Sequence, residues 1–328
     1  MARARERGSP LRVLVTGGAG FVGANLCRRL AAQPEISEVV ALDDLSTGRA
    51  ENLDGTGVRL VVGTILDPDL LAGHVSGADA VVHLAARPSV PRSLADPIAS
   101  HEVNATGTIR VLEACRQAAV HVVAASSSSV YGAVPDLPKH EDLPTRPLSP
   151  YGASKLATEA YALAYGASFG LPVLAFRFFN VYGPLQHAGH AYAAVIPTFI
   201  DAALRGEPVL VHGDGGQTRD FTFVGTVTRV LGEAVLKRVT SPEPVNLAFG
   251  TRVSILDLTR RLSLALGRPI EVHHGPARVG DVHDSQAADG RLRRLFPCAQ
   301  AVPLDTGLEQ TIAWFGDQQV HAESLTTP

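Results

Sequence analysis

Short apolar runs alternate with longer segments of helical spacing along the first 180 residues of the chain. Runs of this length, rich in β-branched residues and bounded by turn residues, are typical of buried strands. The predicted strands are Leu11–Thr16, Glu38–Asp43, Val58–Ile65, Asp79–Ala86, His121–Ser127 and Val173–Tyr182, and the predicted helices are Ala24–Ala32, Glu102–Ala118 and Pro150–Phe169. This alternation predicts an α/β fold, a doubly wound parallel sheet with helices on both faces.

The pattern changes from about Tyr182 onward, where candidate strands and helices become shorter and loops carry more Gly, His and Gln. We expect a second, smaller α/β domain here, with Pro244–Ala248 returning to the first sheet. Residues after Phe315 are polar and unpatterned, which is typical of a terminal tail. The predicted division is residues 11–180 with 223–248 for the first domain, 181–222 with 249–316 for the second, and 317–328 for a flexible tail.

The composition describes a compact folded protein, with 45% hydrophobic and 19% charged residues. The net charge of -3 shows no excess of basic residues of the kind that binds nucleic acid. Cys27, Cys115 and Cys298 form no ligand-like pair, and neither a signal peptide nor a long apolar stretch is present. His187 and His190 lack a carboxylate or Cys at supporting spacing, so no metal is expected. These features predict a cytoplasmic protein without nucleic-acid or membrane partners.

A glycine-rich turn joins the first predicted strand to the first predicted helix. Gly17, Gly20 and Gly23 have the spacing that lets a backbone approach a pyrophosphate at a helix N-terminus. Asp43 ends the second predicted strand, where an acid bonds ribose hydroxyls and repels a 2′-phosphate. The sequence therefore predicts NAD as cofactor, with NADP left as a minor alternative because Arg49 lies close by.

Two polar motifs carry candidate chemistry. A hydroxyl cluster, Ser126–Ser129, follows the predicted strand that ends at Ser127, and Tyr151 and Lys155 lie four residues apart on a predicted helix. That spacing places the phenol and the ammonium on one helix face. A free Tyr titrates near pH ~10, and about 4 kcal/mol of differential stabilisation would bring its pKa near neutrality. Lys155 and a cationic nicotinamide ring favour the phenolate. We expect a base that removes a hydroxyl proton while hydride leaves the same carbon.

Taken in order with His83-Leu84-Ala85-Ala86, these motifs resemble the extended short-chain dehydrogenase/reductase superfamily, and within it the nucleotide-sugar epimerases. The resemblance covers roughly residues 11 to 316. It implies a Rossmann-type NAD domain followed by a smaller α/β C-terminal domain that holds a UDP-sugar. It also implies a homodimer that pairs through Glu102–Ala118 and Pro150–Phe169.

The resemblance assigns site residues by motif. It implies that Ser127, Tyr151 and Lys155 are catalytic. Together with the glycine turn, it gives cofactor contacts at Gly17, Gly20, Phe21, Val22, Gly23, Asp43, Asp44, Ser46, Thr47, Gly48, Thr64, Ile65, Leu84, Ala85, Ala86, Asn104, Tyr151, Lys155 and Phe178. It gives substrate contacts at Ser89, Arg92, Ser127, Ser128, Ser129, Tyr151, Asn180, Gln186, Val195, Val211, His212, Arg219, Arg278, Asp281 and Ser285. Among these, Arg219 and Arg278 would neutralise the negative charge of the substrate's diphosphate.

Residues that are absent help to choose the reaction. Related 4,6-dehydratases carry Asp-Glu where this chain has Ser128 and Ser129. Because water elimination needs an acid–base pair beyond the Tyr, a 4-keto sugar here can only receive its hydride back, which gives C4 epimerisation. Two departures from the family pattern are Thr64, in place of an Asp near the adenine, and Gly225, which interrupts an acidic pair.

The substrate is predicted from three segments that resemble epimerases preferring UDP-GlcNAc, namely residues 89–93, 148–151 and 191–197. A small residue at Ser285 leaves room for an N-acetyl group. We therefore expect UDP-GlcNAc/UDP-GalNAc, with UDP-Glc/UDP-Gal also accepted. The alternatives are a UDP-glucuronate 4-epimerase, a dehydratase or decarboxylase that recruits another acid such as Glu141, and a non-catalytic NAD-binding protein.

Overall fold

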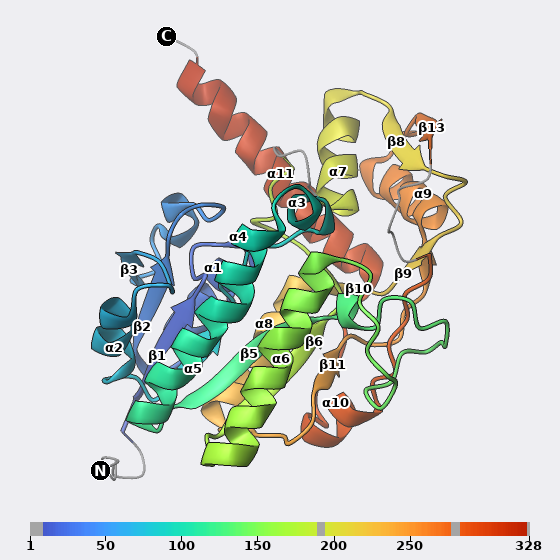
Figure 1. Ribbon diagram of the computed structural model, residues 1–328. Coiled ribbons are helices and arrows are strands. Elements are labelled where there is room, and N and C mark those ends of the chain that lie inside the picture. The colour runs from blue at the N-terminus through green and yellow to red at the C-terminus, as the bar shows by residue number, and fades with distance from the viewer. Residues whose placement is uncertain (1–8, 189–193, 277–282, 327–328) are drawn as a thin grey trace.

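The core of the protein is a parallel sheet of seven strands (Figure 1). The computed structural model describes residues 9–188, 194–276 and 283–326. The strand order is β11-β6-β5-β4-β1-β2-β3, so the chain builds outward in both directions from the β1–β4 pair. The strands are β1 Leu11–Thr16, β2 Ile36–Asp43, β3 Arg59–Val62, β4 Ala80–His83, β5 His121–Ser127, β6 Val173–Phe178 and β11 Val245–Leu247. This confirms the predicted doubly wound α/β fold.

Helices cover both faces of this sheet, which is why its strands are apolar on both sides. One face packs against α1 (Phe21–Ala31) and α8 (Val224–Leu236), and the other against α2 (Pro68–Val75), α5 (Gly107–Ala118) and α6 (Pro150–Phe169). Side chains alternate along each strand, so Val13 and Val15 face the α1 layer whereas Leu14 faces the α5 layer. The two resulting cores hold the sheet rigid between them.

Helix α6 has clear local start and stop signals, and its predicted bounds are the observed ones. The Ser149 side chain accepts a hydrogen bond from the Gly152 N–H at 3.1 Å, and Pro150 occupies the first turn. Gly170 ends the helix in the left-handed conformation, with φ of 67°. The 20-residue helix therefore begins and ends where the sequence requires.

Two predicted elements differ from the structure in kind or number, and others differ only in where they begin or end. The predicted helix 102–118 begins as a π-helical turn, Glu102–Thr106, before α5, and this wider turn buries Asn104. The predicted strand 173–182 is two strands, because the chain leaves the sheet after β6. Its continuation, β7 (Asn180–Tyr182), pairs in parallel with β10 (Phe221–Phe223).

The later part of the chain packs around a second core that includes Tyr182, Phe199, Ile200, Leu258 and Leu262. It contains small two-stranded sheets, and α8 and β11 return to the large sheet. Its further elements are α7 Val195–Arg205, β8 Val209–His212, β9 Thr218–Arg219, β12 Val253–Ser254, α9 Ile255–Leu266, β13 Val272–Gly275, α10 Gly290–Leu295 and α11 Leu304–Thr326. Shorter helices missed by the sequence are η1 Ala50–Leu53, α3 Val90–Ala95, α4 Pro97–His101 and η3 Ser128–Val130.

The C-terminal segment is helical. Residues 317–328 were predicted as a flexible tail, and α11 extends into this segment as far as Thr326 (Figure 1). Among the side chains that the structure describes, Phe315 is the last of this helix in the second core, and the sequence after it carries no apolar stripe that would predict a helix. Within the described ranges, no helix is both long enough and apolar enough to span a bilayer.

Candidate active site

A cavity of about 680 Å³ opens at the carboxyl edge of the sheet, beside the β1–β4 pair where the strand order reverses. Ligands bind at this place in open α/β sheets because the strand ends and helix starts converge there. Most of the predicted cofactor positions line it: Gly17, Gly20, Phe21, Val22, Gly23, Asp43, Asp44, Ser46, Thr47, Ile65, Leu84, Ala85, Ala86, Tyr151, Lys155 and Phe178. The predicted substrate positions Arg92, Ser127 and Gln186 line it too.

Gly17 and Gly23 of the glycine turn leave no room for a side chain. Gly17 has φ of +70°, and a Cβ there would lie 2.7 Å from the Ala85 nitrogen. A Cβ on Gly23 would overlap the Gly17 carbonyl oxygen. Helix α1 starts at this turn without a side-chain cap or an acidic residue in its first turn. Its N-terminal N–H groups are therefore suited to an anionic group such as a pyrophosphate, so the residues present fit NAD.

Asp43 braces this turn from the end of β2. Its carboxylate accepts hydrogen bonds from the Ala19 and Leu45 N–H groups, both at 2.9 Å. Burial raises the pKa of Asp43, and these hydrogen bonds act in the opposite direction. A Cβ on Gly48 would lie 2.7 Å from the same carboxylate, which explains a glycine at a position that does not itself line the cavity.

The other end of the cavity holds the predicted catalytic residues. The buried Lys155 ammonium donates to the Ala125 carbonyl at 2.8 Å, and burial lowers the pKa of Lys155 to about 8. The Ser127 hydroxyl accepts from the Ser129 hydroxyl at 2.9 Å and from its N–H at 3.2 Å. Burial raises the pKa of Tyr151, while its hydrogen bond with Ser127 lowers it. The polypeptide alone therefore does not give Tyr151 the lowered pKa expected from its neighbour, because the Lys155 ammonium turns toward a backbone carbonyl.

A second cavity of about 250 Å³ adjoins the first, since Val181 and Gln186 line both. Its walls come from β7, α7, β8 and the β9 region. The predicted substrate positions Asn180, Val195, Val211, His212 and Arg219 line it. The two cavities therefore adjoin each other at the sheet edge and together bring most of the predicted cofactor and substrate positions into one region.

Several predicted contacts line neither cavity. Asn104 lies behind the site, where its amide donates to Ser154 Oγ at 2.9 Å and its oxygen accepts from the Arg87 N–H at 2.7 Å. Ser89 caps α3, and the Ser285 N–H donates to the Thr218 carbonyl at 3.1 Å. The others that line neither cavity are Gly48, Thr64, Ser128 and Ser129. Arg278 and Asp281 lie outside the described residues.

The structure adds lining residues that were not predicted as cofactor or substrate contacts. In the first cavity these are Leu42, Gly63, Arg87, Pro88, Val103, Ala125, Ser126, Phe179 and Val181. In the second they are Val181, Tyr182, Ala194, Ile196, Thr198, Phe199, Leu210, Gln217, Phe221 and Ile255. The sequence carried signals for some of them. Arg87 and Pro88 directly follow the predicted Leu84–Ala86 segment, Ser126 belongs to the hydroxyl cluster, and Ala194 and Ile196 lie in the segment 191–197. Most of the others come together only through tertiary packing.

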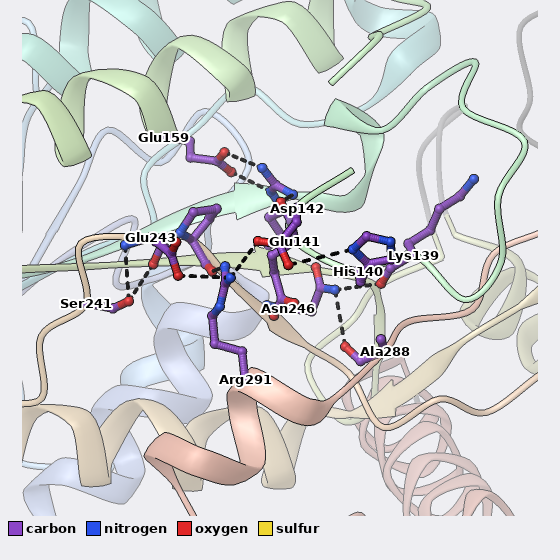
Figure 2. Close-up of polar contacts among 12 residues, drawn as sticks. Lys139, His140, Glu141, Asp142, Glu159, Ser241, Glu243, Asn246, Ala288 and Arg291 are labelled. Carbon is purple, nitrogen blue, oxygen red and sulfur yellow. Dashed lines mark hydrogen bonds and ion pairs between the residues drawn. The ribbon is translucent and has the colours of Figure 1, made fainter. Parts of the chain in front are cut away.

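Acidic side chains are confined to one end of the two cavities. Among the described residues that line them, only Asp43 and Asp44 are acidic, and both lie near the glycine turn. Glu141, the alternative acid, does not line either cavity. Its Oε1 instead accepts from the Asn246 N–H at 2.9 Å, within the polar network of Figure 2.

Histidines show no arrangement for a metal in the described part of the chain, where no three His, Cys, Asp or Glu side chains converge. The His187 ring lies 5.2 Å from the Trp314 ring in an edge-on contact. His83, at the end of β4, is buried between hydroxyl groups, with Thr16 Oγ1 at 2.8 Å and Thr108 Oγ1 at 3.0 Å.

Comparison with known proteins agrees with this geometry. Residues 13–248 match the NAD dependent epimerase/dehydratase family. The chain belongs to this family. The UDP-glucose 4-epimerase of Mycolicibacterium smegmatis is 38% identical over 312 residues, which are 93% of this chain and 98% of that protein.

Solved structures of family members superimpose closely. A UDP-N-acetylglucosamine 4-epimerase from Methanobrevibacter ruminantium M1, in complex with UDP-N-acetylmuramic acid, is 33% identical with a TM-score of 0.89, covering 94% of this chain and 99% of that one. DesIV, a dTDP-glucose 4,6-dehydratase from Streptomyces venezuelae solved with NAD and TYD bound, is 32% identical with a TM-score of 0.86, covering 95% and 98%. The predicted superfamily is confirmed, and NAD is the cofactor of this family member.

The glycine turn gives a direct test of cofactor binding. Gly23→Ala places a methyl group against the Gly17 carbonyl, so we expect NAD affinity to fall at least about tenfold, or roughly 1.4 kcal/mol. Titration calorimetry of the NAD-free protein measures this loss. Gly73→Ala is the matched control, because nothing lies within 4 Å of its added Cβ. Equal NAD affinity in both variants would contradict the assignment of the turn.

His83 predicts the acid sensitivity of the fold. Burial, assisted by the Lys155 charge, lowers the pKa of His83 to about 3, whereas an unfolded His titrates near 6.5. The unfolded chain therefore binds the proton first, and the free energy of unfolding should fall as pH drops from about 6.5 toward 3, by at most about 5 kcal/mol. Urea unfolding of His83→Gln between pH 6 and 4 should show a shallower loss than the wild type. His101→Gln, at an exposed position, should follow the wild-type slope. The same slope in all three proteins would rule out this role.

Proposed function

We propose that this protein is an NAD-dependent UDP-hexose 4-epimerase that acts through a 4-keto-sugar intermediate. The observation that carries the proposal is the catalytic end of the cavity, which presents the hydroxyl of Ser127, the phenol of Tyr151 and the ammonium of Lys155. No acidic residue of the described lining lies there. The relatives named as 4-epimerases support the same reaction class.

The proposed chemistry follows from these groups. NAD, when bound, supplies the hydride acceptor and donor. Tyr151 takes the proton of the C4 hydroxyl, with Ser127 as a hydrogen-bond partner of both oxygens, and Lys155 favours the phenolate. The 4-keto sugar then rotates in the site so that it presents its opposite face to the cofactor. Tyr151 returns the proton to the C4 oxygen as hydride arrives at C4 on that face. No atoms are lost, so the product is the C4 epimer.

A dehydratase would need a further acid and base at the same place. Ser129 occupies one of the positions where related dehydratases carry carboxyl groups, and it donates its hydroxyl hydrogen to Ser127. Glu141 is held by the Asn246 backbone away from the cavities. The described residues that line the catalytic end therefore offer no acid–base pair for the elimination of water, and the likeness to DesIV makes elimination the competing outcome to test.

The sugar we propose is the N-acetylated one. Ser285 lines neither cavity, but its N–H hydrogen bond to the Thr218 carbonyl holds it beside β9, whose Arg219 lines the second cavity, and its small side chain adds little bulk there. The M. ruminantium relative is named a UDP-N-acetylglucosamine 4-epimerase, which supports the same preference. UDP-Glc and UDP-Gal remain the second pair, and UDP-glucuronate the third candidate.

A panel of UDP-sugars tests the reaction. Incubated without added cofactor, the purified enzyme should interconvert UDP-GlcNAc and UDP-GalNAc, as resolved by chromatography. Tyr151→Phe should lower kcat at least about 100-fold, because a general acid–base group of this kind typically contributes 10²–10⁴-fold. Absence of any epimer from every sugar would refute the proposal. A product lighter by water or by carbon dioxide would establish lyase chemistry instead.

We also propose a homodimer that pairs through the α5–α6 side. Large apolar side chains stay exposed on this side of the chain, including Leu94 (58%), Ile98 (72%) and Tyr161 (42%). Such a patch is typical of a contact surface. Figure 1 shows α5 and α6 side by side across one face of the fold, with α4 adjoining them.

Sedimentation velocity should give twice the chain mass for the wild type. Tyr161→Glu places a charge in the middle of the proposed interface and should shift the protein toward monomer. Leu264→Glu is the matched control on α9, where the leucine is 70% exposed and away from this side. A monomeric wild type, or a dimer unchanged by Tyr161→Glu, would contradict the assignment.

A further inference from the structure

A buried ion pair joins the catalytic helix to the sheet. Glu159 of α6 and Arg177 of β6 meet through two hydrogen bonds, Nε to Oε2 at 2.9 Å and Nη2 to Oε1 at 2.7 Å. Their side chains are only 5% and 3% exposed. Figure 2 shows dashed contacts from both carboxylate oxygens of Glu159. Two parallel bonds fix distance and orientation together, which a single-point contact cannot do.

The Arg177 guanidinium is held on its other sides as well. It lies 4.7 Å from the centre of the Tyr131 ring, and its Nη1 donates to the Glu141 carbonyl at 3.3 Å. The Tyr131 hydroxyl in turn donates to Asn246 Oδ1 at 2.7 Å. The arginine is therefore fixed by β11 and by the loop that follows Ser127, and it cannot follow α6 if that helix shifts.

The ion pair lies next to the catalytic lysine. Glu159 follows Lys155 by four residues, one helical turn along the same face. Lys155 bonds the Ala125 carbonyl of β5, and its own carbonyl accepts from Ser126 Oγ at 3.3 Å. Ser126 stands in register with Arg177 across β5 and β6. Helix α6 is thus fastened to adjacent strands at two successive turns.

We propose that Glu159 and Arg177 are positioning residues of the catalytic site: their ion pair fixes the Lys155 turn of α6 against β5 and β6, and each neutralises the other's charge beside Lys155. This inference rests on the proposed function, because that function makes Lys155 catalytic. A purely structural ion pair would stabilise the fold without affecting the charge of Lys155.

The charges around Lys155 distinguish a positioning role of the ion pair from a purely structural one. The titratable or charged groups around it are Tyr151 and Glu159 on α6, His83 in β4, and Arg177 in β6 with Tyr131 over its guanidinium. His83 is neutral above its lowered pKa. The paired charges of Glu159 and Arg177 largely cancel at Lys155, so burial alone sets its titration near 8. Removing one partner leaves the charge of the other uncompensated beside the Lys155 turn of α6.

Three variants test the proposal through pH profiles of NAD affinity and of kcat. Glu159→Gln leaves an arginine that stays charged at every accessible pH, so the midpoint near 8 should fall by about one pH unit. Glu159→Gln with Arg177→Gln removes both charges and should restore the wild-type midpoint while kcat stays low. Arg177→Lys keeps the charge but loses the two-point bond, so kcat should fall roughly three- to tenfold with an unchanged midpoint and KM.

The controls separate this proposal from stability and from the assigned reaction. Glu233→Gln with Lys237→Gln removes an exposed ion pair on α8 and should change neither profile. NAD affinity is measured without sugar, so a wild type inactive on every UDP-sugar refutes the function while the midpoints still test the positioning. An unshifted midpoint in Glu159→Gln overturns the proposal. If Glu159→Gln does not fold, the other two variants decide. A wild-type kcat in both the double variant and Arg177→Lys would also overturn the proposal.

Discussion

The buried ammonium group of Lys155 is the constraint around which the site is organised. A cation inside a protein is costly unless polar partners replace the water it loses. Here the direct partner is one backbone carbonyl, Ala125, at 2.8 Å, and the pKa of the lysine falls to about 8. The helix that carries it must therefore be held firmly, since a small shift would separate the ammonium from its carbonyl. The capped N-terminus of α6 and the Glu159–Arg177 pair provide that hold.

The polar side chains of the site lie at one edge of the sheet because the interior of the sheet is apolar. Strands covered on both faces are apolar along their length, and polar side chains enter only where strands end. Asp43 ends β2, His83 ends β4 and Ser127 ends β5, so all three arrive at the same edge. The edge meets the glycine turn at the place where the strand order reverses, which puts both ends of the first cavity within reach of one dinucleotide.

The second cavity depends on a different buried group, Asp220. Its carboxylate accepts from the Gly250 N–H at 3.0 Å, the Ala287 N–H at 2.9 Å and the Thr251 hydroxyl at 2.8 Å. Burial raises the pKa of Asp220, and these hydrogen bonds lower it. This one side chain thereby joins its own segment to the loop at residues 250–251 and to the segment at Ala287, which are distant from it in sequence. The join keeps β9, which carries Arg219, beside the segment that carries Ser285.

Sequence patterns predicted the elements whose signals are local. Strands 11–16 and 121–127 and helix 150–169 have their observed bounds, because apolar runs, Ser149, Pro150 and Gly170 mark them directly. Short elements such as α3 and α4 lack a full apolar period, and the division at β6 and β7 depends on pairing with β10, which lies some 40 residues away in the sequence. The candidate site divides in the same way. Motif glycines and the Tyr151–Lys155 pair were visible, whereas Val103 and Phe179 reach the cavity only through packing.

The catalytic end is defined as much by charges kept away as by groups present. A carboxylate at Ser128 or Ser129 would lie beside the Ser127 hydroxyl, and its negative charge would raise the pKa of Tyr151 further. The nearest carboxylate to Lys155 along α6 is that of Glu159, and its ion pair with Arg177 compensates its negative charge. Glu141 is held by the Asn246 backbone on the far side of Arg177. Hydroxyl groups can hold a sugar oxygen without adding charge, so a Tyr151 phenolate would meet cations rather than carboxylates among the described lining residues at this end of the cavity, with Lys155 one helical turn away on the same helix.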